Sequence, residues 1–360
     1  MTSRSCLPFA PLLGVASIFT GACHDVSWPS GNEITTVRIL GVRADPASVA
    51  PGQTTRLSAL CADGRGGPQQ DPTCAIEMAW FAGCNNPPQN DPSKCFAAYA
   101  SWAPNFRSPL ADTPVTSDHP EFQVASEFDF YAPSDVLAGT IDSSGMTLHY
   151  GVSYVFFMAC AGRLYPVLGV TDRLPVECRD RDTDALLDQR AYVAGFTTIF
   201  SYDLIQNQNP ELLEPQFDGG SKPAAPCGSD LDCPASMGCS SDAACVPLVP
   251  VCKSANSNPC QPHCLSYRVP NSSFALSDIQ GNPIASPAKS LWWNYYTNAG
   301  AVPDDASLGL PGPVPTGRSD RYGCINWTAP NAPTDQARIW TVLRDNHGGL
   351  NWAVQRVLVR

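Results

Sequence analysis

The sequence has few of the residues on which most enzyme active sites depend. It holds five histidines in 360 residues, and it contains no H-E-x-x-H, no G-x-S-x-G and no glycine-rich phosphate loop. Metalloproteases, serine hydrolases of the elbow type and nucleotide-binding proteins therefore lack their minimal motifs here. A Ser/His/Asp triad stays open, because its members need not be close in sequence. We predict that the protein is not an enzyme and uses no cofactor.

Charged side chains are also scarce, and negative charge dominates among them. Asp, Glu, Lys and Arg make up 15% of the chain, against about 25% in typical globular proteins. The formal net charge is −11 at pH 7. Because a field of this sign repels a phosphate backbone, we do not expect nucleic acid to be a partner.

Long hydrophobic runs are rare, and the one at the N-terminus is too short to span a bilayer. Residues 7–19 (LPFAPLLGVASIF) follow a basic start and have about the length of a signal-peptide core. The small residues Gly21 and Ala22 then precede Cys23. We predict a signal peptide over residues 1–22 and no later membrane span. Ordinary secretory cleavage without an anchor and a buried N-terminal helix are the alternatives.

The run Thr20-Gly21-Ala22-Cys23 resembles the bacterial lipobox, although that motif prefers Leu where Thr20 stands. In lipobox proteins the Cys is acylated and becomes the first residue of the mature chain. The resemblance implies lipidation of Cys23, a tether over residues 23–35 and attachment to a membrane of the cell envelope. His24 stands where Asp retains such proteins in the inner membrane, so the outer membrane is favoured, and the protein is otherwise secreted.

Cysteine is abundant, and its number is informative. Of the sixteen cysteines, Cys6 lies in the predicted signal peptide and Cys23 at its end, which leaves an even set of fourteen between Cys61 and Cys324. Disulfides persist in oxidising compartments, so this count indicates a location outside the cytoplasm. Seven disulfides would leave no thiol for catalysis.

Proline is frequent, at 35 residues, and together with the low charge it favours short strands and turns over helices. Leu57, Ala59 and Cys61 alternate with more polar positions, as in a strand with one covered face. In residues 75–84 the positions Ile76, Met78 and Trp80 share one face. Residues 150–160 are apolar on both faces and should form the most buried strand. One or two helical turns over residues 184–192 are the only helix considered.

The second half of the chain repeats the order of elements in the first half. Residues 264–269 provide another strand, and residues 291–300 (LWWNYYTNAG) match residues 78–83 (MAWFAG). Each half then has an Ala-Pro pair followed by a hydrophobic strand, and the last strand follows a turn at residues 346–349. We predict an all-β protein with two antiparallel β-sandwiches, over residues 36–205 and 263–360.

Two motifs resemble bacterial immunoglobulin-like repeats. One is P-x-x-V-x-P-G-x-x-x-x-L, from Pro46 to Leu57, and the other is W-x-A-P followed by V-x-x-D-x-x-G-G, from Trp327 to Gly349. The chain as a whole resembles uncharacterised envelope lipoproteins of gliding soil bacteria. The resemblance implies that both sandwiches are Ig-like, and it implies nothing about a ligand.

A cysteine-rich module over residues 227–262 separates the two sandwiches. It is too small to bury a hydrophobic core, so disulfides must hold it together. Residues 206–226 are either a linker or, through LLEPQF at 212–217, the first strand of the second sandwich, which would make the module an insertion. Residues 227–245 resemble the N-terminal cysteine-rich repeat of Dickkopf proteins, without its adjacent Cys pair, and this implies an extracellular disulfide knob.

Loop lengths suggest a disulfide pairing but do not settle it. Cys84–Cys95 and Cys160–Cys178 would close short loops and leave Cys61–Cys74. The six module cysteines would pair among themselves: Cys227, Cys233, Cys239, Cys245, Cys252 and Cys260. Cys264–Cys324 would then join B-like and F-like strands of the second sandwich. The alternative is an antibody-like Cys61–Cys160 bridge beside Trp80.

Metal binding is a minor possibility at two places. Cys260, His263 and Cys264 offer zinc ligands, but the module lacks the paired C-x2-C spacing of zinc knuckles, and we predict no metal there. Four acidic residues have the spacing of a calcium loop, although alanines replace its essential Gly and Glu: Asp180, Asp182, Asp184 and Asp188. They are weak calcium candidates, and a solvated loop is the simpler account.

These features predict a non-catalytic cell-envelope lipoprotein. Its expected role is adhesion, scaffolding or surface binding of a protein or glycan, with a membrane as partner through the lipid anchor. The alternative is a disulfide-rich inhibitor or an accessory subunit of a secreted enzyme.

Overall fold

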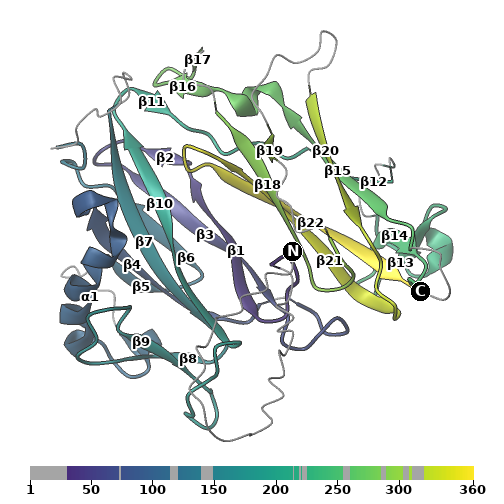
Figure 1. The fold of residues 1–360 in the computed structure, drawn as a ribbon, viewed down its shortest axis with the longest axis horizontal. Helices are drawn as coiled ribbons and strands as arrows, with labels where there is room; N and C mark the ends of the chain where they lie inside the picture. The colour runs from purple at the N-terminus through teal and green to yellow at the C-terminus, as the bar shows by residue number, and fades with distance from the viewer. Residues whose placement is uncertain are drawn as a thin grey trace, which may run out of the picture. The chain divides into compact units, whose positions relative to one another are not determined.

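The computed structural model describes residues 31–72, 74–113, 121–138, 149–213, 215–218, 220, 225–253, 260–284, 289–302, 308–309 and 320–360. The predicted signal peptide and the lipidation candidate Cys23 lie outside these residues. In the described ranges, no helix has both the length and the apolarity that a membrane crossing requires. The fold is all-β, as predicted, and consists of two Ig-like sandwiches with a disulfide-rich module (Figure 1).

The first sandwich has a three-stranded and a five-stranded sheet. The smaller sheet has the order β1 (Val37–Asp45), β3 (Thr54–Asp63), β6 (Glu127–Tyr131). The larger sheet has the order β2 (Ser48–Val49), β10 (Tyr192–Tyr202), β7 (Tyr150–Cys160), β4 (Glu77–Asn85), β5 (Phe122–Val124). All pairs in this sandwich are antiparallel except β2 with β10, because the chain crosses from one sheet to the other between β1 and β2.

The second sandwich repeats this topology. Its smaller sheet has the order β12 (Pro215–Phe217), β15 (His263–Pro270), β20 (Asp320–Trp327). Its larger sheet has the order β13 (Met237–Cys239), β14 (Cys245–Val249), β22 (Leu350–Val359), β21 (Thr334–Asp345), β18 (Leu291–Thr297), β19 (Leu308–Gly309). Here β14 pairs in parallel with β22, as β2 does with β10.

The cysteine-rich module is inserted into the second sandwich. The segment before it forms β12, which pairs with β15, so residues 206–226 supply a first strand rather than only a linker. Within the module, β14 pairs with both β13 and β22. The module therefore shares a sheet with the second sandwich.

The remaining elements lie in connections. They are the hairpin β8 (Arg163–Pro166) and β9 (Val176–Arg179), a small sheet of β11 (Ile205–Gln206), β16 (Leu276–Asp278) and β17 (Pro283–Ile284), and helix α1 (Phe96–Trp102). The described part of the chain also has six 3-10 helices: Pro88–Asn90, Pro92–Cys95, Ala103–Asn105, Leu110–Asp112, Asp230–Asp232 and Asn271–Phe274.

The helix expectation was wrong in both respects. Residues 96–102 form α1, which sequence analysis missed, because the helix is stabilised by packing that the local pattern does not reveal. Its buried Tyr99 contacts Phe81 and Phe156 on the outer face of the larger sheet. Residues 184–192 form no helix, since Asp184 adopts a positive φ of 55° that an α-helix does not permit.

The first core forms around Trp80, which is 0% exposed. Met78 and Ile76 lie in the same core cluster, as the alternation predicts. The indole N–H donates to the Ala125 carbonyl at 2.9 Å, and the ring stacks on Phe128 with centroids 6.0 Å apart. Strand β7 is buried on both faces, with one face in this core and the other beneath α1.

Apolar contacts also join the two sandwiches, which belong to one contact unit from residue 31 onward. A buried cluster combines Ile34 and Leu40 with Trp340 and Leu350 of the β21–β22 hairpin. A Cβ atom on Gly41 would lie 2.9 Å from a Leu350 methyl carbon, so β1 approaches the hairpin closely. Trp340 is thus a core residue.

Trp80 should dominate the stability of the first sandwich. We expect Trp80→Ala to lower the free energy of unfolding by about 3–5 kcal/mol, because a fully buried ring is replaced by a cavity. Tyr131→Ala, at a side chain that is 58% exposed, is the control and should cost less than about 1 kcal/mol. Urea unfolding with the disulfides intact measures both values. Equal costs would contradict the placement of Trp80 at the core.

Candidate functional site

All fourteen cysteines from Cys61 onward are joined in seven disulfides. The pairs are Cys61–Cys74, Cys84–Cys95, Cys160–Cys178, Cys227–Cys239, Cys233–Cys245, Cys252–Cys260 and Cys264–Cys324. They include the four individual pairs that the sequence suggested, two from short loops and two by elimination, and the six module cysteines pair among themselves. The antibody-like Cys61–Cys160 bridge is not formed.

The expected strand positions of Cys264 and Cys324 need a correction. Cys324 lies on β20, which is the neighbour of β15 in the same sheet and corresponds to β6 of the first sandwich. The bridge therefore joins adjacent strands and does not cross between sheets. The prediction placed Cys324 on the strand that carries the second bridging cysteine in antibody domains. In the first sandwich that strand is β7, and its counterpart in the second sandwich is β21, which contains no cysteine.

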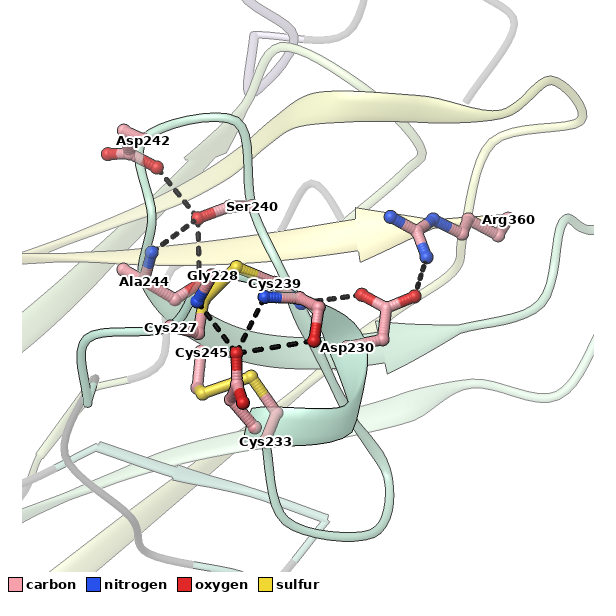
Figure 2. The surroundings of a disulfide bond; sticks show 12 residues. Cys227, Gly228, Asp230, Cys233, Cys239, Ser240, Asp242, Ala244, Cys245 and Arg360 are labelled. Carbon is pink, nitrogen blue, oxygen red and sulfur yellow. Dashed lines mark hydrogen bonds and ion pairs between the residues drawn. A yellow bond between two sulfur atoms is a disulfide. The ribbon is translucent and has the colours of Figure 1, made fainter.

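Charge-assisted contacts fix the disulfide module to the last strand (Figure 2). The Asp232 carboxylate accepts backbone N–H groups of Gly228 and Ser229 at 2.8 and 2.7 Å and so closes the first turn. Asp230 accepts the Cys239 N–H at 2.8 Å and pairs with Arg360 just after β22. Three sulfur atoms, those of Cys227, Cys233 and Cys245, lie within 4.8 Å of one another, but all three are bonded in disulfides.

The other metal candidates have partners within the protein. Cys260 and Cys264 are in disulfides, and His263 Nδ1 lies 2.8 Å from Asp218 Oδ2. In the acidic loop, Asp180 accepts the N–H groups of Asp182 and Thr183 at 3.1 and 2.9 Å. Asp184 accepts the Tyr165 hydroxyl at 2.6 Å, and Asp188 accepts the Arg190 N–H at 2.8 Å. Within the described ranges, no three of these loop carboxylates lie within 4.8 Å of one another.

A pocket of about 600 Å³, lined by polar and apolar groups in roughly equal parts, opens between the first sandwich and the connector that follows β10. Its walls come from the end of β1 with the loop through β2, from residues 202–209, and from Ile279 after β16. Eight of its lining residues are charged or carry a carboxamide: Arg43, Asp45, Gln53, Asp203, Gln206, Asn207, Gln208 and Asn209. Sequence analysis did not identify this site.

Hydrogen bonds hold the connector in place at the pocket. The Asn207 N–H donates to Ser48 Oγ of β2 at 2.7 Å. The Asn209 side chain donates to the Ala44 carbonyl of β1 at 2.7 Å and accepts the Leu350 N–H of β22 at 2.9 Å. The connector thus bonds to both sandwiches. Its amide-rich sequence, Gln206 to Asn209, belongs to the segment that the sequence predicts as a linker or as the first strand of the second sandwich, and this run of amides is the signal that could have indicated the site.

A buried ion pair lies against the connector. Lys289, just before β18, is 1% exposed, and Asp345, at the end of β21, is 4% exposed. Lys289 Nζ is 3.0 Å from Asp345 Oδ2 and donates to Asn207 Oδ1 and to the Gln208 carbonyl, both at 2.8 Å. All three ammonium hydrogens therefore have acceptors, as a buried charge requires.

Asp345 also shapes the β21–β22 turn. Its Oδ1 accepts the backbone N–H groups of His347 and Gly349, each at 2.8 Å. Gly349 faces this carboxylate so closely that a Cβ atom would collide with it, and Gly348 has a φ of +87° that favours glycine. The D-x-x-G-G motif thus places Asp345 in the network.

Burial sets the electrostatics of this network. Loss of solvation lowers the pKa of Lys289, and the nearby Asp345 carboxylate opposes that shift. Burial likewise lowers the pKa of His347, whose Nδ1 is 3.1 Å from the Tyr202 hydroxyl. Burial raises the pKa of Tyr202, which lines the pocket. The neutral forms of His347 and Tyr202 are therefore favoured.

Comparison with protein-family models gives no match, and comparison with curated proteins gives none either. The fold and the geometry of the pocket and its network are therefore the basis for a functional proposal.

His347 should produce a measurable pH dependence of stability. In the unfolded chain the imidazole of His347 has a pKa of about 6.5, whereas in the folded protein its pKa is lower. As the pH falls through the unfolded value, the unfolded chain binds a proton that the folded chain does not, so the free energy of unfolding decreases. We expect His347→Asn to lose this part of the pH dependence, measured by urea unfolding at about pH 8 and about pH 5.5.

His149→Asn, which removes an exposed imidazole instead of a partly buried one, is the comparison variant. If His347→Asn and the wild type lost the same stability on acidification, His347 would not be the responsible group.

Proposed function

We propose that the protein is a non-catalytic binding protein of the cell envelope and that it holds an oligosaccharide in the pocket beside the connector. The observation that carries this proposal is the pocket with its set of carboxamide and carboxylate side chains. Its volume of about 600 Å³ lies within the range of about 300–1,000 Å³ that is usual for ligand sites.

The chemistry of the lining matches a neutral polyhydroxylated ligand. The carboxamides of Gln53, Gln206 and Gln208 both donate and accept hydrogen bonds, and so match hydroxyl groups, which also do both. Asp203 adds a strong acceptor, and Ile279, which is largely exposed, offers an apolar contact for the C–H face of a sugar. A polyanionic ligand is disfavoured by the net charge of −11.

The rigidity of the walls favours binding. The connector is held by hydrogen bonds to β1, β2 and β22, so little backbone must be ordered when a ligand enters. A preorganised site avoids the entropic cost of ordering a loop.

The proposed location follows from the cysteines. Seven disulfides need an oxidising compartment to form and persist. Together with the lipobox-like sequence, they support a lipoprotein anchored through Cys23, with both sandwiches outside the membrane.

Sugar binding is tested with the purified protein on an array of microbial and plant oligosaccharides, followed by titration calorimetry with the best-bound sugar. The double variant Asp203→Ala/Gln206→Ala removes two pocket groups and should weaken that sugar by about tenfold or more, since each lost hydrogen bond costs about 0.5–1.5 kcal/mol. The exposed Asp172→Ala, outside the pocket, is the control with unchanged affinity. An array without any bound sugar, or equal affinity for both variants, would overturn the glycan proposal.

Lipidation is tested by growing producing cells with a fatty-acid analogue. The wild type should be labelled and recovered with membranes, whereas Cys23→Ala should be unlabelled, because the sulfur that carries the acyl chains is gone. Cys6→Ala, within the predicted signal peptide, should label normally. Labelling of Cys23→Ala at the wild-type level would refute the anchor.

A further inference from the structure

The buried network brings together an amine, a carboxamide and a carboxylate. Lys289, Asn207 and Asp345 come from three separate parts of the chain, and each is at most 4% exposed. We propose that Lys289 and Asn207 form an intramolecular isopeptide bond, with Asp345 as the acid–base group.

The two reacting groups are hydrogen-bonded to each other. Lys289 Nζ lies 2.8 Å from Asn207 Oδ1, so the amine is adjacent to the carboxamide carbon that it attacks. Two groups fixed next to each other react as if at very high concentration. Because Asn207 is held by Ser48 through its backbone and by the His347 carbonyl through Nδ2, at 2.7 and 3.0 Å, its orientation is set independently of Lys289.

One carboxylate touches both the attacking and the leaving nitrogen. Asp345 Oδ2 is 3.0 Å from Lys289 Nζ, and Asn207 Nδ2 is 3.1 Å from each of the two Asp345 oxygens. A proton can therefore move from the amine to the departing nitrogen through Asp345 within hydrogen-bond distance. The two N–H groups of the turn, from His347 and Gly349, keep the carboxylate in this position.

The step is balanced without another reactant. The neutral amine of Lys289 attacks Asn207 Cγ, the new C–N bond forms, and the bond from Cγ to Nδ2 breaks. Asp345 takes a proton from the amine nitrogen and gives it to Nδ2, which leaves as ammonia, and the carboxylate is regenerated. Overall, a lysine ammonium and a carboxamide become a secondary amide and an ammonium ion.

The surroundings favour this reaction over hydrolysis. Desolvation lowers the pKa of Lys289, which increases the share of the neutral, nucleophilic amine. The near-complete burial of all three groups keeps water, the competing nucleophile, away from the carboxamide.

The bond would secure the joint between the two sandwiches. It would join residues 82 apart in sequence and close a loop that contains β12, the disulfide module and β15. A mechanical force applied to the first sandwich would then be transmitted through Asn207 to Lys289 at the start of β18, and would bypass the disulfide module. This role requires no bound ligand, so it does not depend on the proposed glycan site.

The test is the intact mass of the full chain, exported to an oxidising compartment, purified, reduced and alkylated. The wild type should be lighter by one ammonia than its processed sequence. A protease digest should yield a branched peptide that joins the segment containing Asn207 to the one containing Lys289. Lys289→Arg and Asp345→Ala should each show the full mass, and Lys94→Arg, at an exposed lysine, should keep the deficit.

Two results would overturn the proposal. A wild-type protein of full mass would mean that the three groups form only an ion pair with hydrogen bonds. A deficit that persists in Lys289→Arg, without a branched peptide, would indicate a succinimide at Asn207 instead. The wild-type mass and digest decide the question even if a variant fails to fold.

Discussion

One buried carboxylate, that of Asp345, connects three separate segments at the joint between the two sandwiches. It accepts two backbone N–H groups within its own turn, and it contacts the carboxamide of Asn207 and the ammonium of Lys289. Removing it would leave a buried cation and several unpaired donors, a change that typically costs several kcal/mol. The β21–β22 turn, the connector and the start of β18 therefore share a single electrostatic centre.

The disulfides stabilise different parts of the molecule from those that this polar network connects. Six of the seven close loops with sequence separations between 8 and 18, and only Cys264–Cys324 is longer, at 60. They stabilise individual loops and the small module, which has too little apolar surface to fold without them. None of these seven disulfides joins one sandwich to the other. The joint therefore depends on noncovalent contacts, which include the apolar cluster around Ile34 and Trp340 and the contacts of Asp345.

Local patterns in the sequence predict the strands well but not the contacts between distant segments. The alternation around Trp80, the doubly apolar β7 and the repeated order of elements all have counterparts in the structure. Helix α1 was missed because packing, not its own residues, stabilises it. The buried network was missed for a related reason: Asn207 lies 138 residues from Asp345, and the local sequence around neither residue indicates a contact with the other. The D-x-x-G-G motif indicates a turn, and only the fold shows what its carboxylate binds.

The pocket and the joint have residues in common, and this links the two proposals. Tyr202 and Asn207 line the pocket, and Tyr202 bonds His347 while Asn207 bonds Asp345. A network that immobilises Asn207 also immobilises one wall of the pocket, so the wall is ordered before a ligand arrives. Since binding then need not order this backbone, stiffness at the joint and affinity at the pocket should change together. A covalent bond between Asn207 and Lys289 would fix the backbone of that pocket wall irreversibly.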